Sequence, residues 1–207
     1  MSSFRIAVFA SGSGSNFQAI IDHIQEKKLD LSIELLVCDK PGAKVIERAE
    51  IANIPVFAFR PKEYVSREAY EQEIVKELQK KQIDLIVLAG YMRLVTDTLV
   101  KPYYGKMINI HPSLLPSFPG LDAIGQAYEY GVKVTGVTVH FVDNGMDTGP
   151  IINQESVIIE ESDTLEQLEN NIHKVEHRIY SEVIDWIAEG RVQLQDRKVN
   201  VLPQKVN

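Results

Sequence analysis

Short apolar runs alternate with segments of helical periodicity over the first half of the chain. In the helical segments, apolar residues recur every three or four positions, as in the stripes that begin at Phe17 and at Tyr70. Strands separated by helices imply right-handed crossovers, and hence a parallel sheet covered by helices on both faces. The runs with the length and composition of strands are Phe4–Ala10, Leu31–Cys38, Val56–Phe59, Asp84–Ala89 and Met107–Ile110.

The pattern changes after residue 132. Two longer apolar runs, Val134–Val142 and Ile151–Ile159, are separated by a polar segment with two glycines, which predicts an antiparallel hairpin with a long loop. A long helix should follow, because apolar residues then repeat every three or four positions over residues 165–187. Asp163 and Thr164 are credible caps for its first turn.

The weakly alternating tail, residues 192–201, predicts a short hairpin or an extended edge. The expected fold class is α/β: a Rossmann-like, mostly parallel sheet flanked by helices, with an antiparallel hairpin extension and a long C-terminal helix. No composition shift marks a linker, so we expect a single domain over residues 1–207. Within it, residues 1–110 would form the parallel half with a glycine-rich turn, and residues 111–207 would hold a proline-rich loop, the hairpin and the long helix.

Composition narrows the possible functions. At 207 residues, with 44% hydrophobic and 25% charged residues, the chain has the makeup of an ordinary globular protein. Its net charge of −7, from 22 basic and 29 acidic residues, argues against a surface devoted to nucleic acid or to an anionic membrane. Cys38 is the single cysteine, which excludes a disulfide framework and a cysteine-based zinc site. No apolar run has the length of a signal peptide core or a membrane span, so we expect a cytoplasmic protein.

A glycine turn, Ser11–Asn16, joins the first predicted strand to the first predicted helix. Its two glycines permit a tight turn and let a ligand approach the backbone. Ser15 or Asn16 can cap the helix, whose free N–H groups and dipole favour a phosphate or a carboxylate. Phe17 stands where a dinucleotide fingerprint needs its third glycine, and no Walker motif follows. The turn therefore predicts a site for a single anion, with an ordinary strand-to-helix turn as the alternative.

The segment Met107–Gly120 carries the most chemistry. Asn109 and His111 lie two residues apart, so their side chains leave the predicted strand on the same side. Three prolines follow, which places His111 just past the strand end, where open α/β sheets build their active sites. An amide donor beside an imidazole suits a reaction in which negative charge develops on a carbonyl oxygen. The alternative is a junction whose polar groups only satisfy the backbone.

For two other polar residues, Asp147 and His140, the sequence leaves both a functional and a purely structural role open. Asp147, in the loop of the predicted hairpin, could orient the His111 ring if the fold brings them together, or it could only form a turn. His140 could line a pocket or pack in the core. His173–His177 matches the His-x-x-Glu-His pattern of inverted zinc peptidases, but short motifs often match by chance and little chain remains for a further ligand. We therefore expect no metal, and favour Glu176 as a polar contact to a substrate.

Several motifs together resemble the phosphoribosylglycinamide formyltransferases, a branch of the formyl-folate transferase family. They are Gly12–Asn16, Leu88–Arg93, Asn109–Pro116 and Asp143–Pro150. The likeness runs from the first strand through the helix that contains Glu176. Other formyl-folate enzymes share the Asn-x-His-Pro-Ser-Leu-Leu-Pro segment, whereas the glycine turn and the compact length point to this branch.

The resemblance implies an enzyme of purine biosynthesis that transfers a formyl group from its co-substrate, 10-formyltetrahydrofolate, to the amine of glycinamide ribonucleotide, without a metal. Its partners would be these small molecules, with no nucleic acid and no membrane, and it would be a monomer or a homodimer. By matching positions, the catalytic residues would be Asn109, His111 and Asp147. The ribonucleotide would be bound by Gly14, Ser15, Asn16, Gly90, Met92, Pro112 and Glu176. The folate site would be lined by Arg67, Met92, Arg93, Leu94, Val95, Asn109, Asp143, Asn144, Gly145, Met146 and Asp147.

One segment departs from the family pattern. Some members carry a histidine-rich Leu-His-Thr-His-Arg-Gln after the proline loop, whereas this chain has Leu121–Gln126 there. A supporting histidine at the position of Asp122 is therefore absent, or its role is filled differently. Family resemblance also leads us to expect a cis bond between Leu115 and Pro116.

Three alternatives remain: another formyl-folate enzyme, a non-catalytic protein and a dehydrogenase. A methionyl-tRNA formyltransferase should carry a further C-terminal domain, and a formyltetrahydrofolate deformylase an N-terminal one, for which we expect the chain to have no room. A non-catalytic nucleotide-binding protein would keep the glycine turn but would not need His111 and Asp147 together. A nicotinamide dehydrogenase is disfavoured by Phe17.

Overall fold

The computed structural model of the protein describes residues 3–27 and 30–204. Its contacts divide the chain into two compact units, Met1–Ile108 and Asn109–Asn207. The boundary falls inside strand β5 (Met107–His111). His111 is the last residue of this strand, whereas the sequence analysis placed it just past the strand end. The expectation of one domain over residues 1–207 stays a prediction.

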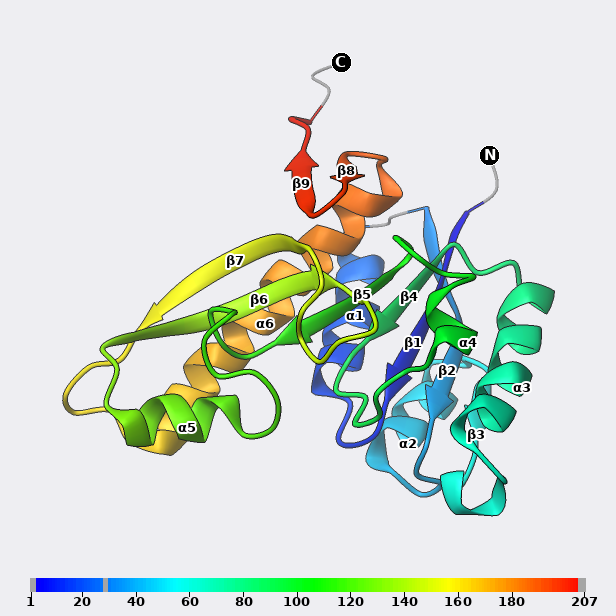
Figure 1. Cartoon of the computed structure of the whole chain (residues 1–207), viewed down its shortest axis with the longest axis horizontal. Helices are drawn as coiled ribbons and strands as arrows, with labels where there is room; N and C mark the ends of the chain where they lie inside the picture. Colours follow the sequence, from blue (N-terminus) through cyan, green and yellow to red (C-terminus); the bar gives the residue numbers. More distant parts are fainter. Residues whose placement is uncertain (1–2, 28–29, 205–207) are drawn as a thin grey trace. The chain divides into compact units, whose positions relative to one another are not determined.

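Unit 1 contains four parallel strands in the order β3-β2-β1-β4 (Figure 1). They are β1 (Phe4–Ala10), β2 (Leu31–Cys38), β3 (Val56–Ala58) and β4 (Leu85–Leu88). All four residues of β4 and the last five of β1 are buried, as their continuous apolar sequences require. The core of the unit is built around these two paired strands.

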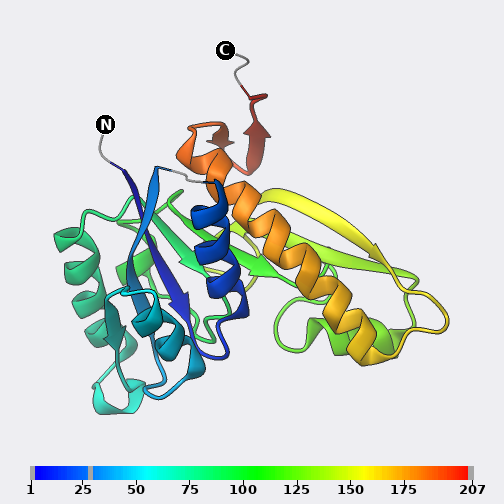
Figure 2. The same cartoon turned by 180° about the vertical axis from the view of Figure 1, so that it is seen from behind.

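The helices of unit 1 cover both faces of these strands. They are α1 (Ser15–Lys27), α2 (Lys44–Ile51), α3 (Arg67–Lys80) and α4 (Asp97–Val100), with a 3₁₀ helix, η1, at Pro61–Glu63. The chain moves outward from β1 to β3 and then returns to β4 on the other side of β1. Because such crossovers are right-handed, α1 and α2 lie on one face and α3 on the other (Figures 1 and 2). The carboxyl ends of β1 and β4 thus flank the point where the order reverses, which is where open α/β sheets bind ligands.

Unit 2 is built on an antiparallel hairpin and a long helix. Strand β6 (Val134–Phe141) pairs with β7 (Ile151–Ile158), and α6 (Leu165–Ala188) packs against both (Figure 2). Thr164, one of the two residues proposed as caps, caps the first turn of α6 in a capping box with Gln167. A shorter helix, α5 (Ala123–Tyr130), precedes the hairpin. The tail forms the predicted small hairpin, β8 (Val192–Gln195) with β9 (Lys198–Val201).

The predicted fold class is confirmed, since parallel strands with covering helices are followed by a hairpin and a long helix. The sequence patterns did not identify α2, α4 or α5. The reason is clearest for α2, in which only Val45 and Ala49 are buried, so its apolar stripe is too short to detect. The Leu115–Pro116 bond is cis, as expected.

Within residues 3–27 and 30–204, no helix combines the length and the apolar character that crossing a membrane requires.

Candidate active site

The glycine turn of unit 1 is held by contacts with α2. The N–H of Val45 donates to the carbonyl oxygen of Gly12 (3.1 Å), and Nε of Arg48 donates to that of Ser13 (2.9 Å). Gly14 has a φ of +73°, and a Cβ atom there would lie 2.6 Å from Cγ2 of Val45. Only glycine meets both conditions, because other residues are strained at this φ and would collide with the α2 side chain.

The start of α1 differs from the prediction. The helix begins at Ser15, and the carbonyl of Gly14 accepts the first helical hydrogen bond, from the N–H of Gln18 (2.9 Å). Ser15 and Asn16 therefore lie inside the first turn, where neither is a cap. Helical geometry leaves the first N–H groups of α1 without intrahelical partners, beside the turn. Oδ1 of Asn16 is buried and has no hydrogen-bond partner among the described residues, so it can accept a hydrogen bond from a ligand.

The loop after β4 lies against the glycine turn. The N–H of Ser11 donates to the carbonyl of Gly90 (3.0 Å), and the N–H of Met92 donates to Oγ of Ser11 (2.9 Å). Gly90 has a φ of +75°, and the side chains of Met92 and Leu94 are 62% and 52% exposed. The structure thus brings Gly90 and Met92, both proposed as ribonucleotide contacts, to the turn that was proposed for the phosphate.

The other residues proposed for the folate site in unit 1 differ in how firmly they are held. Arg93 donates through Nε to Oδ2 of Asp39 at 2.7 Å, and the Asp39 side chain is fully buried. This hydrogen bond raises the pKa of Arg93 and fixes the direction of its side chain. Arg67 is the exposed first residue of α3, and Val95 is half-buried just before α4. Asp39, at the end of β2, is a buried carboxylate that the sequence analysis did not single out.

In unit 2, the structure brings His111 to Asp147. Nδ1 of His111 lies 3.5 Å from Oδ2 of Asp147, and both side chains are largely buried. Nε2 of His111 lies 2.8 Å from the carbonyl oxygen of Phe118, which can only accept, so this nitrogen carries a proton. Nδ1 is then the nitrogen that can take up or release a second proton beside the carboxylate.

Asp147 is held by its backbone and by two imidazoles. Its φ of +56° is left-handed, an uncommon conformation for a residue other than glycine. Oδ2 accepts a hydrogen bond from the N–H of Gly120 at 2.8 Å, and Oδ1 lies 3.8 Å from Nε2 of His140. Burial alone would raise the pKa of the Asp147 carboxyl, but His140, the Gly120 N–H and His111 outweigh burial and lower that pKa. Asp147 is therefore present as a carboxylate at neutral pH.

His140 completes the group, which is called the His–Asp cluster below: Asn109, His111, His140 and Asp147. Nδ1 of His140 lies 2.7 Å from the carbonyl oxygen of Phe141, so it carries a proton; Nε2 accepts in the neutral ring and carries a second proton, directed at Asp147, in the protonated ring. The amide Nδ2 of Asn109 lies 3.3 Å from that Nε2 and can donate to it, which orients the amide. The sequence analysis left His140 between a pocket and the core. The structure shows it buried in contact with two of the proposed catalytic residues.

In the rest of the loop between β6 and β7, residues 144–146 and Thr148 are exposed, Asp143 is half-buried, and Gly149 and Pro150 are buried. Oδ1 of Asp143 accepts from the N–H of Gly145 (3.0 Å) and from Oγ1 of Thr148 (2.6 Å). Asp143 therefore stabilises the loop itself and does not contact His111. Asn144, Gly145 and Met146 lie on the loop surface, with Met146 53% exposed.

Glu176 lies on α6 with its carboxylate buried. Oε2 accepts from Nδ1 of His173 at 2.7 Å, one helical turn earlier, and this contact is the main cause that raises the pKa of His173. Among the described residues no group of three or more His, Cys, Asp or Glu side chains could hold a metal ion. The His-x-x-Glu-His pattern at His173–His177 thus forms a histidine–carboxylate pair within one helix. Pro112, the remaining proposed substrate contact, is half-buried directly after His111.

Comparisons with known proteins show the family to which the chain belongs. The formyl transferase family profile matches residues 4–184. Phosphoribosylglycinamide formyltransferase of Bacillus subtilis is 61% identical over 180 residues, which cover 87% of this chain and 92% of that protein. The crystal structure of glycinamide ribonucleotide transformylase 1 from Symbiobacterium toebii matches with a TM-score of 0.93 and 44% identity, over 98% of this chain and 95% of that one. The corresponding enzyme of Geobacillus kaustophilus matches with a TM-score of 0.87 and 58% identity, over 90% and 99%. The resemblance drawn from the motifs is confirmed, and the chain belongs to the formyl transferase family.

Proposed function

We propose that this protein transfers the formyl group of 10-formyltetrahydrofolate to the amine of glycinamide ribonucleotide, a step of purine biosynthesis. The observation that carries the proposal is the meeting of Asn109, His111 and Asp147 in one partly buried cluster, although Asp147 lies far from the other two in the sequence. The relatives with this activity, which match nearly the whole chain, support the choice of substrates.

The reaction is a direct acyl transfer. The amine of the ribonucleotide attacks the formyl carbon, a C–N bond forms, and the carbonyl oxygen takes up negative charge in a tetrahedral intermediate. The C–N bond to the folate then breaks, the carbonyl re-forms, and the proton lost by the amine replaces the formyl group on the folate nitrogen. Stabilising the oxyanion and moving this proton are the two tasks that the protein has to perform.

The His–Asp cluster supplies groups for both tasks. One N–H of the Asn109 amide is oriented by His140, which leaves the other to donate to the oxyanion. Nε2 of His111 is engaged by Phe118, so Nδ1 would donate to the same oxygen when it is protonated. The carboxylate of Asp147, 3.5 Å from Nδ1, would stabilise that protonated ring and relay the proton between the two nitrogens of the substrates. These hydrogen bonds strengthen as charge develops, which is what lowers the barrier.

The remaining residues would bind and align the two substrates. We assign the ribonucleotide's phosphate to the glycine turn, through Gly14, Ser15 and Asn16, because free helical N–H groups favour an anion there. Gly90, Met92 and Pro112 would flank the ribonucleotide, and Glu176 would accept from its ribose hydroxyls or its amine. The folate would contact Arg67, Met92 to Val95, Asn109 and the loop Asp143–Asp147. Alignment of the two reactants supplies much of the rate in such reactions.

We further propose that the protein acts in the cytoplasm as a monomer or a homodimer, on small molecules and not on nucleic acid or membranes. The acidic net charge supports the choice of partners.

The test is formyl transfer from 10-formyltetrahydrofolate, measured with glycinamide ribonucleotide, with methionyl-tRNA and with water as acceptors. We expect turnover with the ribonucleotide alone, and a loss of about 10³-fold in kcat for His111→Ala. Comparable turnover with water would instead identify a deformylase. Activity of His111→Ala equal to that of the unaltered protein would remove the His–Asp cluster from the mechanism.

A further inference from the structure

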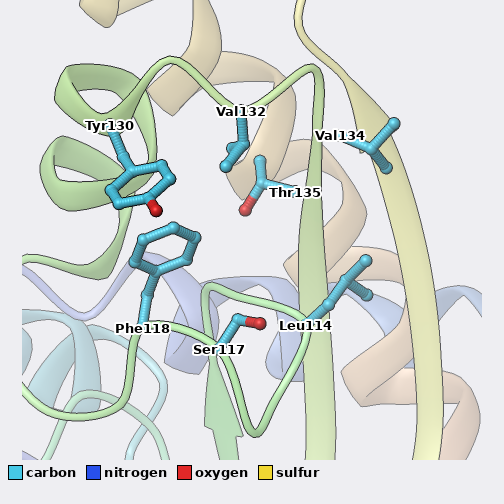
Figure 3. Close-up of a pocket in the computed structure, with 7 residues that line it drawn as sticks. All are labelled: Leu114, Ser117, Phe118, Tyr130, Val132, Val134 and Thr135. Atoms are coloured by element: carbon cyan, nitrogen blue, oxygen red, sulfur yellow. The ribbon is translucent and has the colours of Figure 1, made fainter.

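An open hollow of about 410 Å³ lies in unit 2, between α5, β6 and the proline loop (Figure 3). The rings of Phe118 and Tyr130 and the aliphatic side chains of Leu114 and Val132 are among its walls. None of its lining residues is charged, and Tyr130 is 80% exposed. Since a few well-placed polar or charged groups give a pocket its specificity, these walls favour no particular ligand. A buried side chain of unit 1, Glu71, is more informative.

Glu71 is an acidic residue that the proposed reaction does not use. It lies in the second turn of α3, and only 2% of the residue is exposed. Burial raises the pKa of its carboxyl, and hydrogen bonds from Thr96 counteract part of that rise. Because burying an acidic group costs free energy, its hydrogen-bond partners must compensate for the lost hydration. The partners of Glu71 therefore indicate what the residue does.

Both oxygens of Glu71 accept hydrogen bonds from one residue, Thr96. Oε1 accepts from the Thr96 N–H at 2.9 Å, and Oε2 accepts from Oγ1 of Thr96. The same hydroxyl accepts from the N–H of Thr98 at 3.2 Å, so its own proton is available to Glu71. A carboxylate only accepts, and it can therefore satisfy both donors of Thr96 at once. Glu71 thus holds the backbone and the side chain of Thr96 together.

Thr96 directly follows the stretch Met92–Val95, which we assign to the folate site. This stretch forms neither helix nor strand, so its position depends on contacts with its neighbours. Ser11 and the buried Asp39 hold the beginning of the stretch, through the contacts described above. Glu71 holds its end, because Thr96 is the next residue.

Glu71 also links this stretch to Arg67, a second proposed folate contact. Arg67 lies one turn before Glu71 on α3, so the two residues are on the same face of the helix. Helices α3 and α4 pack against each other, and Thr96 is the residue that caps α4. A displacement of Thr96 from Glu71 would therefore change the spacing between two groups of contacts to one ligand.

We propose that Glu71 is a positioning residue of the folate site, which fixes the stretch Met92–Val95 relative to Arg67 by holding Thr96. The identity of the ligand rests on the proposed function. Because its side chain is buried, Glu71 acts through the loop and not by touching the folate. Its loss should therefore weaken folate binding, and should affect the ribonucleotide and the chemical step much less.

The contact with Thr96 is tested by amide hydrogen exchange, followed by NMR on the full chain without ligands. Glu71→Ala removes both acceptors, whereas Glu71→Gln keeps the size of the side chain and can still accept from the Thr96 N–H. We expect the Thr96 amide to exchange about tenfold faster in Glu71→Ala, the value of one hydrogen bond to a charged group, and less than that in Glu71→Gln. The Met92 amide, which donates to Ser11, should exchange at an unchanged rate.

The effect on the folate is tested by titration calorimetry with tetrahydrofolate, the product of the proposed reaction. We expect its Kd to rise about tenfold in Glu71→Ala and by a smaller factor in Glu71→Gln. At saturating substrates kcat should stay within about threefold, and KM for the ribonucleotide within about twofold, because the chemical groups are unaltered.

The matched control is Glu77→Gln, in which another acidic residue of α3 loses its charge. Nζ of Lys80, an exposed side chain, lies 3.9 Å from the Glu77 carboxylate. Such a surface pair contributes little, so the Thr96 exchange rate and the Kd should match those of the unaltered protein. Thr96→Ser keeps both donors to Glu71 and should behave in the same way.

An unchanged Thr96 exchange rate in both Glu71 variants would overturn the contact. Faster exchange with an unchanged Kd would overturn the positioning role, as would an absence of tetrahydrofolate binding to the unaltered protein. A fall in kcat as large as the rise in Kd would also overturn it, since it would indicate a general loss of structure. Failure of the proposed function has a different signature, in which the unaltered protein binds tetrahydrofolate but transfers no formyl group to the ribonucleotide.

Discussion

The glycine turn of unit 1 and the His–Asp cluster of unit 2 are built in opposite ways. The turn presents backbone groups, and its shape depends on Gly14 fitting against Val45. The cluster presents side chains that can gain or lose a proton, and its shape depends on hydrogen bonds to Phe118, Gly120 and Phe141. Backbone N–H groups do not titrate, whereas imidazoles and carboxylates do. The comparison teaches that substitutions in the turn should change substrate binding, whereas substitutions in the cluster should change the rate of the chemical step.

Among the variants that test this comparison, Asp147→Asn should have the largest effect. The amide can keep the contact with the Gly120 N–H, but it cannot stabilise a protonated His111 or accept a proton. We expect kcat to fall by roughly 10²-fold or more, with KM for the ribonucleotide little changed. Steady-state kinetics on both substrates measures this split.

The matched control for that variant is Asp163→Asn, a carboxylate of unit 2 that accepts from the N–H of Glu160 in an exposed loop. Its kcat should stay within about twofold of the unaltered protein, as surface changes of this kind usually do. An Asp147→Asn enzyme as fast as this control would contradict the role given to the cluster.

Gly14→Ala should have the next largest effect, and on binding. The new Cβ meets Val45 at 2.6 Å in addition to the strain of a φ of +73°. We expect KM for the ribonucleotide to rise by about tenfold and the free energy of unfolding to fall by about 2–4 kcal/mol. Kinetics and denaturant unfolding report the two quantities separately.

Gly42→Ala is the control that isolates backbone strain. Gly42 has a φ of +91°, but no atom lies within 4 Å of a Cβ built there. This variant should lose only about 1 kcal/mol of stability and keep its KM. An equal rise in KM for both variants would show that the packing of the turn against α2 is unimportant.

Thr164→Ala should have a smaller effect, confined to stability. It removes the capping box of α6, far along the chain from the cluster residues. We expect a loss of about 1 kcal/mol in the free energy of unfolding and an unchanged kcat. Thr164→Ser should restore the stability, and a fall in kcat at saturating substrates would mean that α6 shapes the cluster.

The smallest effect is on the pH dependence of the free energy of unfolding. It comes from the charge of Asp147 and appears only in acid. The pKa of this carboxyl is lowered in the folded protein, so its contribution to stability is complete above the unfolded pKa, about 4, and is lost as pH falls through the lower folded pKa. The pH dependence of unfolding below about pH 4 should therefore be shallower in Asp147→Asn than in Asp163→Asn. If the free energy of unfolding fell equally with decreasing pH in the two variants, the lowered pKa of the Asp147 carboxyl would be contradicted.

Much of the fold followed from local pattern. β1 and β2 have the predicted bounds, because continuous apolar runs flanked by turn residues are a strong signal for buried parallel strands. α5 was not recognised, since its eight residues follow Asp122 in a left-handed conformation without a side-chain cap. The expected capping by Ser15 or Asn16 was wrong because the helix already begins at Ser15, so the cap position, from which a side chain can accept from the following N–H groups, is Gly14.

The sequence by itself determined the succession of the strands with α1, α3 and α6, the glycine turn, and the placing of Asn109 and His111 on one side of a strand. These features depend on periods of two or of three to four residues, or on glycine next to a strand end. Only the tertiary structure decided that Asp147 and not Asp143 reaches His111, that His140 joins them, and that the Phe118 carbonyl holds the ring. Those contacts depend on the left-handed backbone of Asp147 and Phe118. They depend also on the β6–β7 hairpin, whose loop carries Asp147 to His111 at the end of β5. Local patterns contain no information on such contacts, since they join residues far apart in the chain.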